Sequence, residues 1–281
     1  MSIRYSRRRV QGSGAILPTT VEEYIDARVA SGDWVLPHRF KFNESTATVI
    51  AVDDGSQATS PPHAAHENSV MSNAAVTTHA DNTQLGAAYT SANSRYTLLA
   101  AGTQFFNTGP GLTNVGALFF FFKRTLNSNI TYLMDCVLTS GSTPRLTITI
   151  NATTGYLVWT DFYLASSNGR SFTFQTNNLH TLGDAFVAFV QRGDGTGVHC
   201  YVNGVEDTNV STGSAGADTN GFNGWFRSYY LNPNWNSANS RIILGALGRP
   251  VQGHLDGTID HLSWVDGAVS DAQIAAMQAL R

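Results

Sequence analysis

Charged residues are scarce in this chain. Lysine, arginine, aspartate and glutamate together make up 13% of its 281 residues, about half of the ~25% that is usual in globular domains. The 17 basic and 20 acidic side chains leave a formal net charge of −3. Because nucleic acids and anionic membranes are attracted by a basic field, this balance argues against both as partners.

Further absences bear on where the protein is made and on its covalent links. No run reaches the ~18 apolar residues of a membrane span, and the first residues, Met-Ser-Ile-Arg-Tyr-Ser-Arg-Arg-Arg, lack the apolar core of a secretory signal. We therefore expect synthesis in a host cytoplasm. The two cysteines, Cys136 and Cys200, fall in different predicted strands, and a reducing compartment favours buried free thiols over a disulfide.

Residues for catalysis are also scarce. Glycoside hydrolysis needs two carboxyl groups that flank the scissile bond, yet the only glutamate after position 67 is Glu206. Asp256 and Asp260 are four residues apart on one predicted strand, where they resemble a structural turn pair. The sequence contains no Gly-x-Ser-x-Gly, His-Glu-x-x-His or Gly-x-x-x-x-Gly-Lys motif. These absences predict a protein without enzymatic activity.

No metal site is predicted. His63, His66 and His79 lie in a polar stretch with loose spacing, which favours exposed side chains over a tetrahedral zinc site. Calcium takes carboxylate and carbonyl oxygens, and without a fixed motif Ca²⁺ stays an open option while no other cofactor is expected. The available carboxylates are Asp161, Asp207, Asp218 and Asp256.

Turn-forming residues and short β-type segments are abundant. The chain contains 26 glycines together with many Asn, Ser and Thr residues, a composition typical of a turn-rich β protein. Short apolar or alternating segments recur from Ser94 onward and indicate a β-sandwich. The predicted strands are 95–100, 115–123, 130–138, 145–150, 155–163, 170–176, 185–192, 197–203, 240–247 and 255–265.

The last thirty residues predict how the chain ends. A strand over 255–265 runs into Asp266-Gly267, which has turn chemistry. Ser270 is placed to cap a helix with Gln273 reaching back to it, and Val269 and Ile274 have the spacing of a hydrophobic staple. A short helix with one apolar stripe follows, made of Ile274, Met277 and Leu280.

Together these segments resemble a laminin G-like domain of the concanavalin A-like lectin and glucanase group. The match covers roughly residues 93–281 and departs from the family pattern at His261, where a second aspartate is common. The resemblance implies an all-β, antiparallel concanavalin A-like sandwich, or jelly roll. The stretches that carry it are 115–123, the hairpin 186–205 with its Tyr201-Val202-Asn203-Gly204 turn, Ile242-Ile243-Leu244-Gly245, and the closing strand.

The residues before this domain divide into an arm and a linker. Residues 1–45 hold a basic arm and a capping-box sequence, Thr20-Val21-Glu22-Glu23, which begins a helix predicted at 21–31. Residues 46–92 are rich in Ser, Thr, Ala and Asn, have too little apolar surface for a core of their own, and are predicted to link the arm to the sandwich at 93–281. The residues expected to anchor the arm are Arg4, Arg7, Arg8, Arg9, Tyr24, Ile25 and Trp34.

Four consecutive phenylalanines, Phe119 to Phe122, require an unusual strand. A half-exposed strand alternates apolar and polar residues, so this run predicts that both faces of its sheet are covered. Leaving two of the rings in water would forfeit ~1.5–3 kcal/mol each. Either the N-terminal extension or a partner covers the second face.

The stretch 212–240 is the candidate binding site. Long loops in compact domains are usually functional or disordered, and the aromatic residues argue against disorder. Three interpretations are open: the aromatic faces stack on sugar rings, they bury against another subunit, or they cap the sandwich. The residues assigned to carbohydrate binding or to an interface are Trp225, Tyr229, Tyr230, Trp235 and Asn234.

The preferred hypothesis from the sequence is a non-enzymatic structural component of a virus particle, of the bacteriophage capsid-decoration or fibre type. Its arm would contact other virion proteins, such as a capsid shell protein, and a homo-oligomer, with a trimer as the suggested state, would display the sandwich on the virion. The alternative is a lectin that binds host-cell glycans through the 212–240 loop. A hydrolase is the least favoured class.

Overall fold

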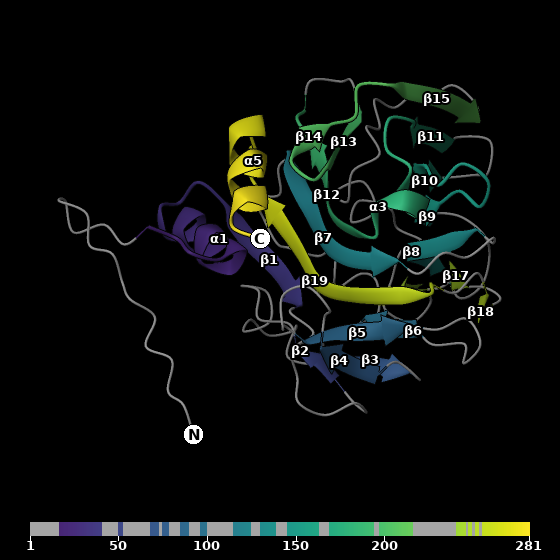
Figure 1. The fold of residues 1–281 in the computed structure, drawn as a ribbon, viewed down its shortest axis with the longest axis horizontal. Coiled ribbons are helices and arrows are strands. Elements are labelled where there is room, and N and C mark those ends of the chain that lie inside the picture. Colours follow the sequence, from purple (N-terminus) through teal and green to yellow (C-terminus); the bar gives the residue numbers. More distant parts are fainter. Residues whose placement is uncertain are drawn as a thin grey trace.

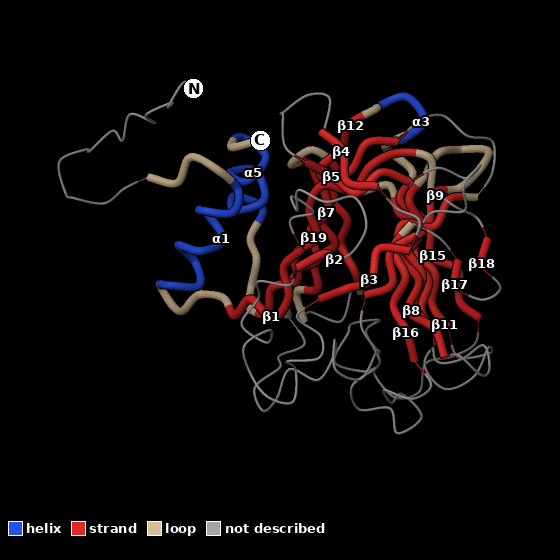
Figure 2. Tube along the Cα trace, turned by 90° about the horizontal axis from the view of Figure 1, so that it is seen from below, coloured by secondary structure: helices blue, strands red, loops and turns tan. Residues whose placement is uncertain are grey.

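Two antiparallel sheets stack face to face as a β-sandwich (Figures 1 and 2). This confirms the predicted all-β sandwich with short helices near both ends. The computed structural model describes residues 17–40, 50–52, 68–72, 75–78, 85–89, 96–99, 115–124, 130–138, 145–162, 169–193, 197–215, 240–245, 247–248, 251–252 and 255–281.

The first sheet has eight strands. Their order is β14-β13-β12-β7-β19-β5-β4, and β1 pairs with β19 beside this path. The strands are β1 (Val35–Phe40), β4 (Ala75–Thr78), β5 (Leu85–Tyr89), β7 (Gly116–Arg124), β12 (Asp184–Gln191), β13 (Val198–Val202), β14 (Val205–Glu206) and β19 (Gly257–Asp266).

The second sheet has nine strands in the order β15-β11-β10-β9-β8-β16-β6-β3-β2. They are β2 (Ile50–Val52), β3 (Asn68–Ser72), β6 (Tyr96–Leu99), β8 (Thr131–Leu138), β9 (Arg145–Ile150), β10 (Leu157–Phe162), β11 (Gly169–Phe174), β15 (Val210–Ala215) and β16 (Ser240–Leu244). A separate ladder joins β17 (Leu247–Gly248) to β18 (Val251–Gln252), and the helices of the described residues are α1 (Val21–Ala30), α3 (Leu179–Leu182) and α5 (Asp271–Ala279).

Aliphatic and aromatic side chains fill the space between the two sheets. Trp159 of β10 is fully buried there, with its ring centroid 5.1 Å from that of Phe189 of β12. Because successive side chains of a strand point to opposite faces, Leu157 and Trp159 enter this core while Val158 and Thr160 point away from it. The alternation seen in the sequence therefore decides which face each strand buries.

The phenylalanine run lies in β7 and faces two different cores. Phe120 and Phe122 belong to the core between the sheets, whereas Phe119 and Phe121 belong to a second core on the outer face of the eight-stranded sheet. The expectation that both faces are covered is confirmed, and the N-terminal extension provides part of the cover (Figure 1). The covering residues come from α1, the segment before β1, and α5: Val21, Ile25, Trp34, Ile274 and Met277.

Trp34 joins the N-terminal extension to the end of the chain. Its ring centroid lies 6.3 Å from that of Phe119, and its Nε1 donates a hydrogen bond of 2.9 Å to the carbonyl of Ala268. The strand β1 follows directly and pairs with β19, with a shift in register between Val35 and His38. Pro37, which has no N–H for a sheet ladder, lies at this irregularity.

Both longer helices begin where the sequence predicted. Thr20 caps α1 by accepting a hydrogen bond of 3.1 Å from the N–H of Glu23. At α5 the capping box is complete, because the N–H of Gln273 donates to Ser270 Oγ and the N–H of Ser270 donates to Gln273 Oε1. These caps satisfy N–H groups that have no partner within the helix.

The strands expected after residue 94 are present within a few residues of their predicted bounds. The sequence did not predict β1 to β5 or the short and edge strands β14, β15, β17 and β18. Of these, β2 and β3 belong to the nine-stranded sheet, and β4 and β5 to the eight-stranded sheet. Residues 46–92 were predicted to be a linker, but their described residues form strands that extend both sheets. Residues 35–40, within the predicted N-terminal extension 1–45, form β1 and belong to the sandwich as well.

Cys136 and Cys200 are buried free thiols, as predicted. Burial, together with the negative charges of Asp207 and Glu206, raises the pKa of Cys200 well above its usual value. Among the described helices, none has the length and apolar character that crossing a membrane requires.

Candidate functional site

The outer face of the nine-stranded sheet differs from that of the eight-stranded sheet. The helices α1 and α5 pack on the eight-stranded sheet. In the nine-stranded sheet, by contrast, outward side chains along β9, β10, β11 and β15 are mostly half-buried or exposed. This part of the outer face is the candidate for contact with a ligand.

Strand pairing arranges these outward side chains in rows across four strands. Thr160 of β10, for example, lies between Thr147 of β9 and Ser171 of β11. We call this surface the polar face. Row by row it consists of Thr147, Thr160, Ser171 and Gly213; then Thr149, Val158, Thr173 and Ser211; then Tyr156 and Gln175.

Apart from Val158 and Gly213, the residues of these rows carry hydroxyl or amide groups, and none of them is charged; Arg145 of β9 occupies the next row, opposite Phe162. Thr160 Oγ1 and Ser171 Oγ are 3.3 Å apart, and Gln175 Nε2 donates a hydrogen bond of 3.1 Å to Ser211 Oγ. Neighbouring strands are ~4.8 Å apart, so donors and acceptors repeat at short, regular intervals. Because each hydroxyl can donate one hydrogen bond and accept two, the surface suits an uncharged ligand that is itself rich in hydroxyl groups.

The polar face ends toward the middle of its sheet. Asp135 of β8 pairs with Thr147, and Ile243 of β16 pairs with Asp135, so both lie on the outer side. Both are nevertheless 0% exposed. In the row of Thr147 the accessible surface therefore runs from β9 to the terminal strand β15, whereas in the row of Thr149 the half-buried Tyr132 of β8 extends it by one strand.

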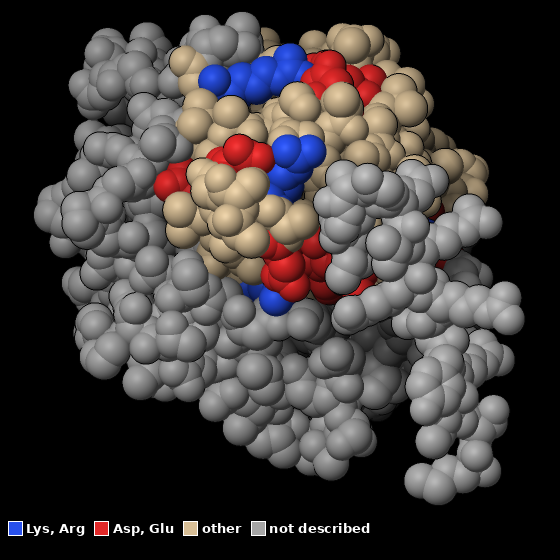
Figure 3. Space-filling model, turned by 90° about the vertical axis from the view of Figure 1, so that its left-hand side faces the viewer, with Lys and Arg blue, Asp and Glu red and all other residues tan. Residues whose placement is uncertain are grey.

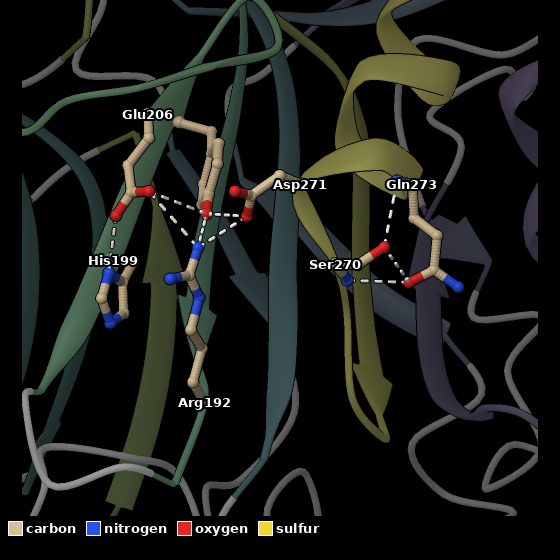
Figure 4. Close-up of polar contacts among 7 residues, drawn as sticks. Arg192, His199, Glu206, Ser270, Asp271 and Gln273 are labelled. Atoms are coloured by element: carbon tan, nitrogen blue, oxygen red, sulfur yellow. Dashed lines mark hydrogen bonds and ion pairs between the residues drawn. The ribbon is translucent and has the colours of Figure 1, made fainter.

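A second polar cluster joins α5 to the edge of the eight-stranded sheet (Figure 4). We call it the Arg192 clasp. Arg192 Nη2 donates to Asp271 Oδ1 at 2.6 Å, to Glu206 Oε2 at 3.3 Å and to the hydroxyl of Tyr201. The Tyr201 hydroxyl also donates to Asp271 Oδ1 at 2.6 Å, and His199 Nδ1 lies 2.7 Å from Glu206 Oε1.

The electrostatics of the clasp keep its tyrosine protonated. Burial, the hydrogen bond to Asp271 and the charge of Glu206 raise the pKa of Tyr201, although the charge of Arg192 opposes the shift. Tyr201 is 2% exposed, and both carboxylates are bound to Arg192. The clasp therefore holds the first turn of α5 against β13 and β14.

Opposite charges are also paired elsewhere on the side of the molecule that carries α1 and α5. There Lys and Arg side chains lie next to Asp and Glu side chains, and neither sign dominates (Figure 3). Arg39 of β1, for example, lies 2.7 Å from Asp26 of α1, and Arg28 lies 3.0 Å from Asp33. The described residues on this side therefore form no extended field of one sign that would attract a charged partner.

His261, the position that departs from the family pattern, lies beneath α1. Its Nε2 is 2.6 Å from Ser263 Oγ, and its Nδ1 is 3.5 Å from Glu22 Oε1 of α1. Burial opposes ionisation of Glu22, but the interaction with His261 and hydrogen bonds from the backbone and Thr20 outweigh it and lower the pKa of Glu22 to about 2. His261 therefore helps to hold the N-terminal helix in place.

The substitution Glu22→Gln is expected to lower the free energy of unfolding by about 1–3 kcal/mol at pH 7, because it removes a partly buried charged contact. The folded pKa lies below the unfolded value, so ionised Glu22 contributes fully above pH ~4.5 and its contribution is lost as the pH falls toward 2. Denaturant unfolding of both proteins between pH 7 and pH 2 measures this. A difference between the two proteins that is unchanged at low pH would contradict the assignment.

The structure places only some of the residues predicted for the site. Trp225, Tyr229, Tyr230, Asn234 and Trp235, and likewise the arm residues Arg4, Arg7, Arg8 and Arg9, lie outside the described residues. Ile25 and Trp34 are buried in the second core, and Tyr24 packs against that core. These three residues therefore pack the extension against its own sandwich.

The carboxylates weighed for calcium do not form a metal site in the described part of the chain. Asp207 accepts hydrogen bonds from Thr176 N, Thr176 Oγ1 and Asn209 N at 2.9, 2.6 and 3.1 Å. These bonds hold a turn and occupy the carboxylate. No group of three or more His, Cys, Asp or Glu side chains among the described residues is placed to hold a metal ion.

The sequence did not identify the polar face as a candidate site. Its signal is the alternation in 145–150, 157–162 and 169–174, where Thr and Ser occupy most of the positions opposite the buried residues. Each strand alone reads as an ordinary half-exposed strand. The surface emerges only when pairing places these strands side by side.

No protein-family model and no curated protein sequence matches the chain. Among solved structures, domain 4 of AbnA, a GH43 extracellular arabinanase from Geobacillus stearothermophilus, in complex with arabinotriose, is 14% identical with a TM-score of 0.52. The match covers 88% of this chain and 99% of that domain. At this identity the likeness establishes the sandwich fold and no more.

Two sialidase structures are also similar. The Ruminococcus gnavus IT-sialidase CBM40 bound to α2,3-sialyllactose is 12% identical with a TM-score of 0.44, over 58% of this chain and 82% of that module. The K499G mutant of the NanB sialidase from Streptococcus pneumoniae is 16% identical with a TM-score of 0.48, over 68% of this chain. The chain spans only 27% of that sialidase.

Proposed function

We propose that this protein is a non-catalytic carbohydrate-binding sandwich that holds an uncharged saccharide on the polar face. The observation that carries the proposal is the contrast between the two outer faces. Helices cover part of the outer face of the eight-stranded sheet, while the rows defined above on β9, β10, β11 and β15 present hydroxyl and amide groups and contain no charged residue.

The ligand of the AbnA domain supports the choice of ligand class. The match covers 88% of this chain and 99% of the AbnA domain, and that domain was solved with arabinotriose, a neutral saccharide. The chemistry of the polar face agrees with such a ligand, because neutral hydroxyls exchange hydrogen bonds with Thr, Ser and Gln side chains. A carboxylated sugar, in contrast, is best met by an arginine fork, and none of the residues that form these rows is an arginine; Arg145 of β9 occupies the next row, opposite Phe162.

The expected affinity is modest. A hydrogen bond contributes about 0.5–1.5 kcal/mol after exchange with water, so four or five of them correspond to a dissociation constant of roughly 0.1–1 mM. Two half-buried aromatic side chains, Tyr156 in the rows and Tyr132 of β8 opposite Thr149, are placed to stack against a sugar ring. At biological concentrations of the glycan, stable attachment would then require several copies of the protein to bind the same glycan.

Replacing two hydroxyls in the central row tests the proposal. Thr149→Val combined with Thr173→Val keeps the shape of both side chains and removes their hydrogen bonds, so the dissociation constant for arabinotriose should rise by about tenfold or more. Titration followed by heteronuclear NMR measures the dissociation constant and identifies the residues whose resonances shift on binding.

Two comparisons make this test decisive. The control Ser31→Ala removes an exposed hydroxyl beside α1, away from the polar face, and should bind like the parent protein. Sialyllactose should bind more weakly than neutral saccharides. If neither arabinotriose nor a panel of neutral oligosaccharides perturbs the polar face at millimolar concentration, the proposed function is wrong.

The role in a virus particle stays a prediction from the sequence. The basic arm that motivates it lies outside the described residues, and the apolar anchors Ile25 and Trp34 are used within the fold. A carbohydrate-binding face is compatible with such a role, because a sandwich attached by its arm leaves the nine-stranded sheet available. The polar face itself carries no indication of where the protein is displayed.

A further inference from the structure

The strand β15 ends the nine-stranded sheet, and no other described strand pairs with its free edge. Its sequence, Val-Ser-Thr-Gly-Ser-Ala, contains no charge and no proline, and its six residues pair with β11 without a shift in register. Residues Val210 to Gly213 are exposed. Natural sheets usually protect such an edge by charge, proline, a bulge or short length, and β15 has none of these devices.

The hydrogen-bond pattern shows which backbone groups of β15 point outward. Gln175 N donates to Asn209 O at 2.9 Å, and these residues lie directly opposite each other in the continued register of β11 and β15. Opposed residues in antiparallel strands alternate between bonded and non-bonded pairs. Ser211 and Gly213 therefore bond to β11, whereas Val210, Thr212 and Ser214 direct their N–H and C=O groups to the free edge.

We propose that two copies of this chain pair through β15, antiparallel, with a twofold axis at Thr212. This register places Thr212 opposite Thr212 and Val210 opposite Ser214, so the outward groups of both strands meet. The sequence is suited to itself, because self-pairing brings no like charges opposite each other and an antiparallel pair of identical strands satisfies twofold symmetry.

The edge strand β15 is better suited to pairing with a second copy than β14, the edge strand beside the clasp. The terminal strand of the eight-stranded sheet next to the clasp, β14, has only two residues, and its Glu206 is bound by Arg192 and His199. Pairing through β15 joins two nine-stranded sheets into one continuous sheet. Their outer faces then lie on the same side, because the twofold axis is perpendicular to the sheet.

The resulting dimer is expected to be weak. An edge contact of six residues is smaller than the ~1,600 Å² of a standard protein interface, so dissociation should occur at roughly 10–100 µM. Sedimentation velocity from low to several hundred micromolar protein should show a reversible monomer–dimer equilibrium. A chain that stays monomeric over this whole range overturns the proposal and leaves the edge for a strand of another protein.

Variants of Thr212 locate the contact. Thr212→Pro removes an outward N–H at the twofold axis without touching a bond to β11, and edge strands tolerate proline at such positions. It should raise the dissociation constant of the dimer by roughly tenfold or more. Circular dichroism and the midpoint of thermal unfolding should match those of the parent, which separates loss of the dimer from loss of the fold.

Opposite charges provide a recovery test. Thr212→Lys and Thr212→Glu should each dimerise more weakly than the parent, because like charges face each other across the axis. An equimolar mixture of the two variants should dimerise more strongly than either alone, and Ser31→Lys, which adds the same charge as Thr212→Lys at the exposed end of α1, should behave like the parent. Dimerisation that persists unchanged in all Thr212 variants means that the copies meet elsewhere, and the proposal is then wrong.

Discussion

Phe119→Ala and Phe120→Ala are each expected to lower the free energy of unfolding by about 3–5 kcal/mol. Adjacent residues of a strand point in opposite directions, and in an ordinary half-exposed strand only one of the two would be costly. Here both are 0% exposed, Phe120 between the sheets and Phe119 beneath the N-terminal extension. Two substitutions one residue apart therefore create cavities in two separate cores.

Equilibrium denaturation in urea measures both effects. Lys123→Ala, in the same strand, is the control, because Lys123 is half-exposed and its ion pair with Asp184 is long, at 3.8 Å. Such a surface pair contributes about 0–1 kcal/mol. If Phe119→Ala costs no more than Lys123→Ala, the outer face of β7 is not a second core in solution.

Trp34→Ala is expected to detach the N-terminal helix from the sandwich as well as to destabilise it. Trp34 is 2% exposed, contacts Phe119 and bonds to Ala268 of the chain's last turn, so its loss should cost about 3–5 kcal/mol. Much of this cost arises locally, because α1 has ten residues and helices of that length are marginal without tertiary packing. Amide protons of α1 and β1 should then exchange faster than those of β10 and β11.

Hydrogen exchange resolved by peptide distinguishes this local opening from global unfolding. The neighbouring residue supplies the control: Val35 is 50% exposed, and Val35→Ala should leave the exchange of α1 close to that of the parent. Equal acceleration of exchange across both sheets in the Trp34 variant would argue that the extension is not a separable unit.

The sequence alone predicted the elements whose signals are local. Helix starts at Val21 and Asp271 depend on side chains within one turn, such as Thr20, Ser270 and Gln273, and these signals were sufficient. The four consecutive phenylalanines Phe119 to Phe122 indicated by themselves that both faces of their strand are buried. Strands after residue 94 were recognised because apolar residues alternate or cluster between Gly and Asn turns.

The strands before residue 94 were missed for physical reasons. Strands β4 and β5 consist largely of Ala, Thr and Gly, residues that give little hydrophobic signal, and β1 contains a proline that argues against a strand. These segments are strands because long-range pairing with β19 and with each other satisfies their backbone groups. No window of sequence contains that information.

The candidate site was predicted less well than the fold. The sequence directed attention to aromatic side chains in 212–240, since aromatic residues are conspicuous, whereas Thr and Ser at alternating positions are not. The polar face requires the registers of four strands, and Thr147 and Gly213, which stand in one row, are 66 positions apart in the sequence. The Arg192 clasp likewise joins residues 79 positions apart.

The two sheets also differ in how freely their residues can change over evolution. Each residue of the run in β7 fills one core or the other, so few substitutions there preserve the fold. On the polar face, outward side chains such as Thr149 and Thr173 are only half-buried, so exchanging them for other polar side chains should cost little stability. Under the proposed function, the preference for one saccharide over another can therefore change among relatives by substitutions on the polar face while the core residues and the sandwich stay the same.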